Sequence, residues 1–111
     1  MIEKIVFDYL TDNLAYPVYM ERPEDPEVTC VVIEKTGSSR ENHVDSAVFA
    51  VQSYAPSLYE AASLNETVKS VMDDMITVPE VSAVRLNSDY NFTDTTKKAY
   101  RYQAIYNIFY L

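Results

Sequence analysis

The spacing of hydrophobic positions changes along the chain, and these changes predict its secondary structure. Over residues 98–111, apolar and aromatic side chains recur at every second position, which is the spacing of a β-strand. One register holds Tyr100, Tyr102, Ala104, Tyr106, Ile108 and Tyr110, and the other holds Arg101, Gln103, Ile105, Asn107 and Phe109. Since both registers carry apolar side chains, the pattern predicts a strand that has neighbours on both faces.

Helical spacing occurs in two places. Near the start, apolar side chains at Ile2, Ile5, Val6, Tyr9 and Leu10 predict an amphipathic helix of about three turns. A second helix is predicted from Ser57, because Ser57 and Glu60 have the spacing of a capping box. Its apolar stripe consists of Leu58, Ala61, Ala62, Leu64, Val68, Val71, Met72, Met75 and Ile76. Pro79 is expected to end this helix.

The remaining apolar segments have strand character. Residues 28–35 and 44–54 predict an antiparallel hairpin joined by a polar loop at residues 37–42. Residues 18–20 suit a short extended segment, and the prolines and acids of residues 23–26 predict a turn.

After the second helix, residues 81–86 predict a strand, and the polar residues 87–96 predict the turn that leads into the last strand. The expected order is therefore α-β-β-α-β-β. It predicts an α+β protein of one domain, residues 1–111, with two helices on one face of a mainly antiparallel sheet of about four strands.

In this two-layer sandwich, the second face of the sheet has no cover from its own chain. The chain contains ten tyrosines and no tryptophan. Because tyrosine is amphipathic and common at protein interfaces, we expect the tyrosine-rich surface to pack against other subunits.

Charge and composition exclude several function classes. Nine basic and seventeen acidic residues give a net charge of −8, which opposes binding to a phosphate backbone, so no nucleic-acid recognition is expected. The one cysteine, Cys30, lies in an apolar run and is interpreted as a buried core residue. Charged residues interrupt the N-terminal apolar positions, so neither a signal peptide nor a membrane span is expected, and synthesis in the cytoplasm follows.

Candidate chemistry is sparse. The one histidine, His43, has Asp45 nearby but no second metal ligand and no serine elbow. A single glycine, Gly37, excludes the glycine-rich phosphate loops. Oxygen-bearing side chains with the spacing of a calcium loop occur at Asn87, Asp89, Asn91 and Thr93. Phe92 stands where that loop needs glycine, and Lys98 where it needs an acid. We therefore expect no catalytic, metal or cofactor site, and a protein that is not an enzyme.

Three segments resemble a known family. Residues 52–62 (QSYAPSLYEAA), 86–95 (LNSDYNFTDT) and 100–104 (YRYQA) resemble small tail proteins of siphophages and prophages of Gram-positive bacteria, specifically the phage tail terminator family. The resemblance spans nearly the whole chain and includes the order of its elements.

This resemblance implies a structural virion protein of the tail and neck region, made in the cytoplasm of the bacterial host. It implies a six-fold ring on the head-proximal end of the tail tube, which ends tube polymerisation and contributes to head-tail joining. The implied partners are other copies of the chain, the tail tube protein and the head-tail connector. A head-completion or minor capsid subunit is an alternative, and so is a small α+β ligand-binding or enzymatic domain.

Two polar segments are candidate interaction loops. The first consists of Ser38, Ser39, Arg40, Glu41 and Asn42, with charged side chains at its tip. The second consists of Asp89, Tyr90, Asn91 and Phe92, which put two aromatic rings on a polar turn. We expect these loops to contact the tube, the connector or neighbouring subunits.

Overall fold

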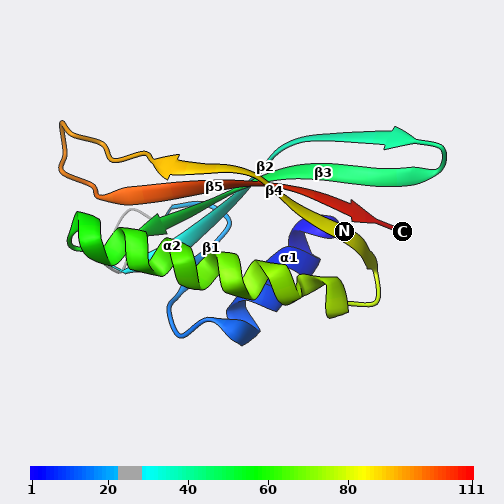
Figure 1. Cartoon of the computed structure of the whole chain (residues 1–111), viewed down its shortest axis with the longest axis horizontal. Helices are drawn as coiled ribbons and strands as arrows, with labels where there is room; N and C mark the ends of the chain where they lie inside the picture. The colour runs from blue at the N-terminus through cyan, green and yellow to red at the C-terminus, as the bar shows by residue number, and fades with distance from the viewer. Residues whose placement is uncertain (23–28) are drawn as a thin grey trace.

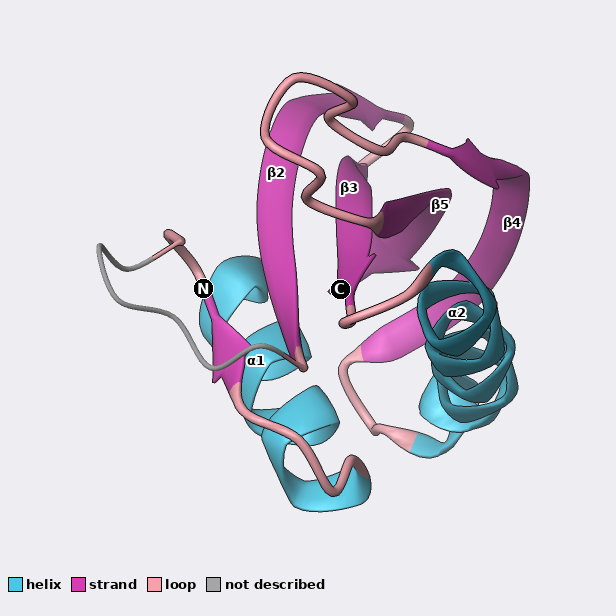
Figure 2. Cartoon of the chain, turned by 90° about the vertical axis from the view of Figure 1, so that its left-hand side faces the viewer, coloured by secondary structure: helices cyan, strands magenta, loops and turns pink. Residues whose placement is uncertain are grey.

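A computed structural model, which describes residues 1–22 and 29–111, contains a sheet on one side and two helices on the other (Figure 1). The elements in chain order are α1 (Ile2–Asn13), β1 (Val18–Tyr19), β2 (Cys30–Glu41), β3 (Val44–Tyr54), α2 (Leu58–Asp73), the 3-10 helix η1 (Asp74–Thr77), β4 (Val81–Asn91) and β5 (Arg101–Tyr110). Figure 2 shows α1 near β1 and β2, and α2 near β4. The α+β class predicted from the sequence is confirmed.

Both predicted helices are present. In α1, one stripe of Ile2, Val6 and Leu10 is buried. The hydroxyl of Ser57 accepts a hydrogen bond from the Glu60 amide at 3.2 Å, so the predicted N-cap of α2 is confirmed. The α-helical part ends at Asp73, and η1 continues the chain to Thr77.

The sheet has five strands in the order β1-β2-β3-β5-β4. The expected sheet of about four strands and the expected order α-β-β-α-β-β each lack one strand. The added strand is β1, in which Val18 and Tyr19 pair parallel to Val31 and Val32. Backbone pairing with β2 makes a strand of this two-residue segment, which is too short to show a period. The turn predicted at residues 23–26 lies outside the described residues.

The hairpins are longer than predicted. In β2 and β3 the pairing continues to Glu41 and Val44, so the expected loop at residues 37–42 is wrong for most of its length. Only Asn42 and His43 form the turn, both with positive φ (52° and 65°), as two-residue hairpin turns require. Similarly, β4 runs to Asn91. Polar side chains mark solvent exposure in both places, but the backbone of an exposed segment can still form a ladder.

The larger hydrophobic core lies between the helices and the sheet, and a smaller cluster of Cys30, Val32 and Tyr54 lies on the opposite face of the sheet. The larger core contains Phe49 of β3 and Ala104, Tyr106 and Ile108 of β5, all almost completely buried. The tyrosine register of the last strand therefore faces the helices, and Tyr110 packs against the same core. The expectation that these tyrosines face other subunits is wrong for Tyr106, because its ring fills space beneath the helices.

Two core tyrosines differ in how their hydroxyls are satisfied. The Tyr9 hydroxyl donates to the Val71 carbonyl at 2.6 Å and ties α1 to α2. The Tyr106 hydroxyl is buried and has no hydrogen-bond partner among the described residues. Burial raises the pKa of Tyr106 well above its usual 10.0, and the charges of Asp73, Asp89 and Glu66 add to this.

Tyr106→Phe is expected to raise the free energy of unfolding by about 1 kcal/mol, because a buried hydroxyl without a partner carries a desolvation cost. The matched change Tyr9→Phe should lower it by about 1 kcal/mol through loss of a hydrogen bond. Since folding raises the Tyr106 pKa, this titration leaves the stability unchanged well below pH 10.0 and lowers it as the pH rises beyond 10.0, because the unfolded chain then loses a proton that the folded chain keeps. Urea unfolding between pH 8 and 11 measures both effects. A loss of stability in Tyr106→Phe would show that the hydroxyl contributes favourably.

Candidate interaction face

The sheet face opposite α1 and α2, called the outer face below, has no helix over it (Figures 1 and 2). Its side chains alternate along each strand with those of the core. On the central strands β3 and β5 and the edge strand β4, the outer-face residues are as follows. They are Val48, Ala50, Gln52 and Tyr54 of β3, Arg101, Gln103, Ile105, Asn107 and Phe109 of β5, and Ala83, Arg85, Ser88 and Tyr90 of β4. This face contains aromatic, amide and guanidinium groups beside small apolar ones.

A hydrogen-bonded row crosses the outer face from β4 to β3. The Gln103 amide donates to the Tyr90 hydroxyl at 2.6 Å, and the Gln52 amide donates to the Gln103 carbonyl oxygen at 2.8 Å. The Tyr54 hydroxyl donates to the Gln52 side-chain oxygen at 3.3 Å. Arg101 completes the row with a 2.7 Å hydrogen bond to the Tyr54 hydroxyl. Each side chain is held by its neighbours, so the row is preorganised.

Arginine and aromatic side chains connect the two ends of this row. The Arg101 guanidinium lies 4.3 Å from the centre of the Phe92 ring, and its Nε donates to the Phe92 carbonyl at 2.6 Å. The rings of Phe92 and Tyr90 meet edge to face, with centroids 5.9 Å apart. Phe92, which follows β4, thereby links Arg101 back to Tyr90. Cation-π and edge-to-face contacts of this kind stabilise exposed aromatic rings in one orientation.

Two further arginines lie over rings of the outer face. The Arg22 guanidinium is 4.3 Å from the centre of the Tyr54 ring, and that of Arg85 is 5.5 Å from the centre of Phe109. Within the described part of the chain, neither these two arginines nor Arg101 forms an ion pair with a carboxylate. The part of the outer face formed by β3, β5 and β4 therefore presents positive charge in a protein whose net charge is −8. On β2, Glu34 adds a carboxylate to the same face.

Four cations elsewhere are neutralised by the chain itself. On the helices, Lys4 pairs with Asp8 at 2.6 Å, and Lys69 of α2 pairs with Asp89 at 3.0 Å. Two more pairs, each at 3.0 Å, join Lys35 to Glu3 and Arg40 to Asp45. The Glu3 pKa is lowered, first by a hydrogen bond from the backbone and then by the Lys35 bond. Among the described residues, Lys97 and Lys98 between β4 and β5 are exposed cations that form no ion pair either. What distinguishes the arginines of the outer face is therefore their position over aromatic rings.

The two candidate loops from the sequence lie at different ends of the sheet (Figure 1). Tyr90 and Phe92 belong to the outer-face network described above. The segment from Ser38 to Asn42 does not, since its contacts stay within its own hairpin: Ser39 bonds the Ser46 hydroxyl at 2.8 Å. A contact role for this hairpin end stays a prediction.

The sequence did not indicate that Gln52, Tyr54, Arg85 and Arg101 belong with Tyr90. The alternation of the last strand placed Arg101 and Gln103 on one face, but the partners on other strands depend on register. Gln52 lies opposite Gln103, and Tyr90 lies opposite Gln103 from the other side.

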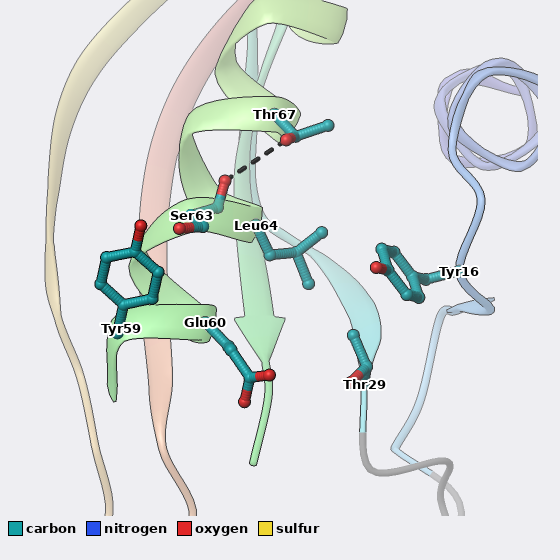
Figure 3. A pocket seen from close by; sticks show the side chains of 7 residues that line it. All are labelled: Tyr16, Thr29, Tyr59, Glu60, Ser63, Leu64 and Thr67. Carbon is teal, nitrogen blue, oxygen red and sulfur yellow. Dashed lines mark hydrogen bonds between the residues drawn. The ribbon is translucent and has the colours of Figure 1, made fainter. Parts of the chain in front are cut away.

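A shallow hollow of about 230 Å³ lies on the helix side, between α2 and Tyr16 (Figure 3). Its lining combines hydroxyls with one carboxylate and consists of Tyr16, Thr29, Tyr59, Glu60, Ser63, Leu64 and Thr67. The Thr67 hydroxyl donates to the Ser63 carbonyl at 3.3 Å, and Glu60 is occupied by the Ser57 cap. The polar groups of this hollow are therefore partly used within α2.

Among the described residues, no three His, Cys, Asp or Glu side chains are grouped to hold a metal ion. His43 lies exposed at the β2-β3 turn. No described helix is both long enough and apolar enough to cross a membrane.

No protein-family model matches this chain, and no curated protein matches it. Function is therefore inferred from the fold and from the chemistry of the outer face.

Proposed function

We propose that the chain is a structural subunit of a phage or prophage tail. In this proposal it forms a ring at the head-proximal end of the tail tube, ends tube polymerisation and contributes to head-tail joining. The observation that carries the proposal is the outer face, a helix-free sheet surface with a preorganised row of tyrosine, glutamine and arginine side chains.

The three segments that resemble tail terminators meet in this row. Gln52 and Tyr54 come from residues 52–62, Tyr90 and Phe92 from residues 86–95, and Arg101 and Gln103 from residues 100–104. Segments far apart in the chain thus contribute to one surface. A shared surface gives a physical reason for these residues to occur together in an assembling protein.

The composition of the row also suits a protein interface. Tyrosine and arginine are enriched at interface centres and supply much of the binding energy there. In the row Tyr90 is exposed and available to a partner, whereas Tyr54 and Gln103 are already buried within the chain and support it. The intramolecular hydrogen bonds already restrict these side chains, so docking costs less conformational entropy than it would for free ones. The extents of the molecule, 43 × 25 × 24 Å, make it elongated along the hairpins, and their ends provide separate surfaces for the tube and the connector.

The proposal is tested with purified full-length chain by gel filtration with light scattering and by negative-stain imaging, alone and with the tail tube protein. Closed rings, free or at one end of tubes, are expected. Rings that join only head portals would favour the head-completion role. A monomer under both conditions that binds a specific small ligand would contradict the proposal and favour a ligand-binding domain.

The double change Tyr90→Ala and Phe92→Ala should weaken ring formation by at least about tenfold, because two aromatic contacts of the outer face are lost. The monomer should stay folded, since both side chains are more than 40% exposed. Sedimentation velocity measures assembly, and circular dichroism measures folding.

Tyr59→Ala is the matched control, because this exposed tyrosine lies on α2, away from the outer face. It should leave ring formation unchanged. Equal effects of the control and the double variant would mean that the outer face has no special role.

A further inference from the structure

The helix side of the molecule carries a groove of opposite charge to the outer face. It lies between α1 and the chain leading into β4, has a volume of about 270 Å³, and is called the acidic groove below. Its lining consists of Ile5, Asp8, Tyr9, Asp12, Val78 and Glu80. Apolar side chains thus alternate with three carboxylates.

Two of these carboxylates have no counter-ion. Asp8 pairs with Lys4, whereas Asp12 and Glu80 form no ion pair with any described residue. The last turn of α1 contains no basic residue. The side chains of Asp12 and Glu80 are both exposed, so the groove offers negative charge beside an apolar surface.

We propose that the outer face of one copy docks on the acidic groove of a second copy. This proposal rests on the proposed ring function and names the two surfaces that build the ring. Arg85 of the outer face would meet Asp12 and Glu80 of the neighbour. Phe109 and Ile105, both partly buried, would cover Ile5 and Val78. The structure offers both halves of this contact on one chain.

Charge complementarity favours this head-to-tail arrangement over a symmetric one. Two outer faces placed together would bring unpaired arginines against arginines, and two acidic grooves would bring carboxylates against carboxylates. Like charges across an interface disfavour the wrong partner. A contact between two different surfaces can repeat from copy to copy, and it closes into a ring when the rotation between copies allows.

The edges of the sheet are less suited to the contact. The pairing of β4 with β5 shifts register between Val81 and Ala83 and again between Leu86 and Ser88. On the other side β1 covers only Val31 and Val32 of β2, and beyond that pairing the register of β2 shifts between Lys35 and Gly37. Bulges of this kind blunt edge strands and oppose strand pairing between chains. The faces rather than the edges are therefore assigned to the assembly.

The test uses charge reversal in the full chain. Arg85→Glu changes an exposed side chain whose one described contact is the Phe109 ring, and Asp12→Lys with Glu80→Lys changes the acidic groove. Each variant alone should self-associate at least about tenfold more weakly than the wild type. A mixture of the two should associate in equal amounts, because the unchanged outer face of the groove variant meets the unchanged groove of Arg85→Glu, and the two reversed surfaces also carry opposite charges.

A chain with all three reversals should associate with itself again, since the charges are exchanged across the contact. Lys97→Glu is the matched control: it makes the same change of charge as Arg85→Glu at an exposed position outside both surfaces, and association should persist. Sedimentation velocity at about 0.05 M and 0.5 M salt should show the wild-type contact weakening as salt screens it.

The outcomes separate this inference from the proposed function. Rings that form normally from the Arg85→Glu chain, or a groove variant that still self-associates as the wild type does, would overturn the head-to-tail contact and leave the ring function standing. A mixture of the two variants that does not associate would also overturn the head-to-tail contact. The same holds for an outer face that binds other acidic proteins but not a second copy. A wild-type chain that stays monomeric alone would also overturn the inference, whereas the ring function fails only if the chain stays monomeric with the tube protein too.

Discussion

Phe49→Ala is expected to lower the free energy of unfolding by about 4 kcal/mol. The Phe49 side chain is fully buried in β3, in the core shared by the sheet and the helices. Its removal loses the transfer free energy of the ring and leaves a cavity that packed neighbours fill only in part. Since a domain of this size has a total stability of about 5–15 kcal/mol, this single change should bring it near unfolding.

Urea unfolding followed by circular dichroism measures this loss as a shift of midpoint at constant slope. Phe92→Ala is the matched control, because it removes the same side chain from a position that is 41% exposed. It should cost about 1 kcal/mol or less, while weakening assembly. If the two changes cost the same, the packing described between α2 and the sheet would be wrong.

Asp89→Ala is expected to cost about 2 kcal/mol, because it leaves the buried Asn65 amide without a partner and removes one of the two carboxylates that pair with Lys69. Asp89 accepts hydrogen bonds from Asn65 at 2.8 Å and from Lys69 at 3.0 Å. Asn65 is only 1% exposed, so its amide cannot turn to solvent without moving α2. Asp89 therefore fixes α2 over the edge strand β4.

The pH dependence of this variant follows from Lys69. The hydrogen bond to Asp89 is the main cause that raises the pKa of Lys69 above its usual 10.5, followed by the bond to Glu66. A raised folded-state pKa means that the contribution is complete below pH 10.5 and is lost as the pH rises through the folded-state value. The stability difference between wild type and Asp89→Ala should therefore shrink above about pH 10.5.

Asp73→Ala serves as the control for that experiment. Asp73 is exposed at the C-terminal end of α2, where a negative charge opposes the helix dipole. Its removal should leave stability unchanged or slightly higher across the same pH range. A loss like that of Asp89→Ala would assign the effect to overall charge rather than to the Asn65 and Lys69 contacts.

Local patterns were sufficient to predict most elements. The spacing of Ile2, Val6 and Leu10 predicted α1, and the pair of Ser57 and Glu60 predicted the start of α2, because both signals come from residues within one or two turns. The alternation over residues 98–111 predicted β5 for the same reason. The short parallel strand β1 gave no such signal, since its structure comes from β2 and not from its own two residues.

Side-chain polarity does not show where the strands of the two hairpins end. Ser38 and Asp89 are polar and were assigned to loops, yet both are paired within strands. Side-chain polarity reports contact with water, whereas a strand is made by backbone hydrogen bonds. Where the sheet extends beyond the helices, polar side chains therefore occur on residues whose backbone is paired in a strand.

By itself, the sequence determined that this chain forms two amphipathic helices and several strands of an α+β fold, and that it carries an excess of acid. Only the tertiary structure decided that Tyr106 faces the helices, that Gln52, Tyr90 and Arg101 share the outer face, and that Asp12 and Glu80 share the acidic groove. Periodicity is a property of neighbouring residues, and the chain itself encodes it. Which distant residues meet depends on strand register and on the packing of helices against the sheet, which exist only once the chain has folded.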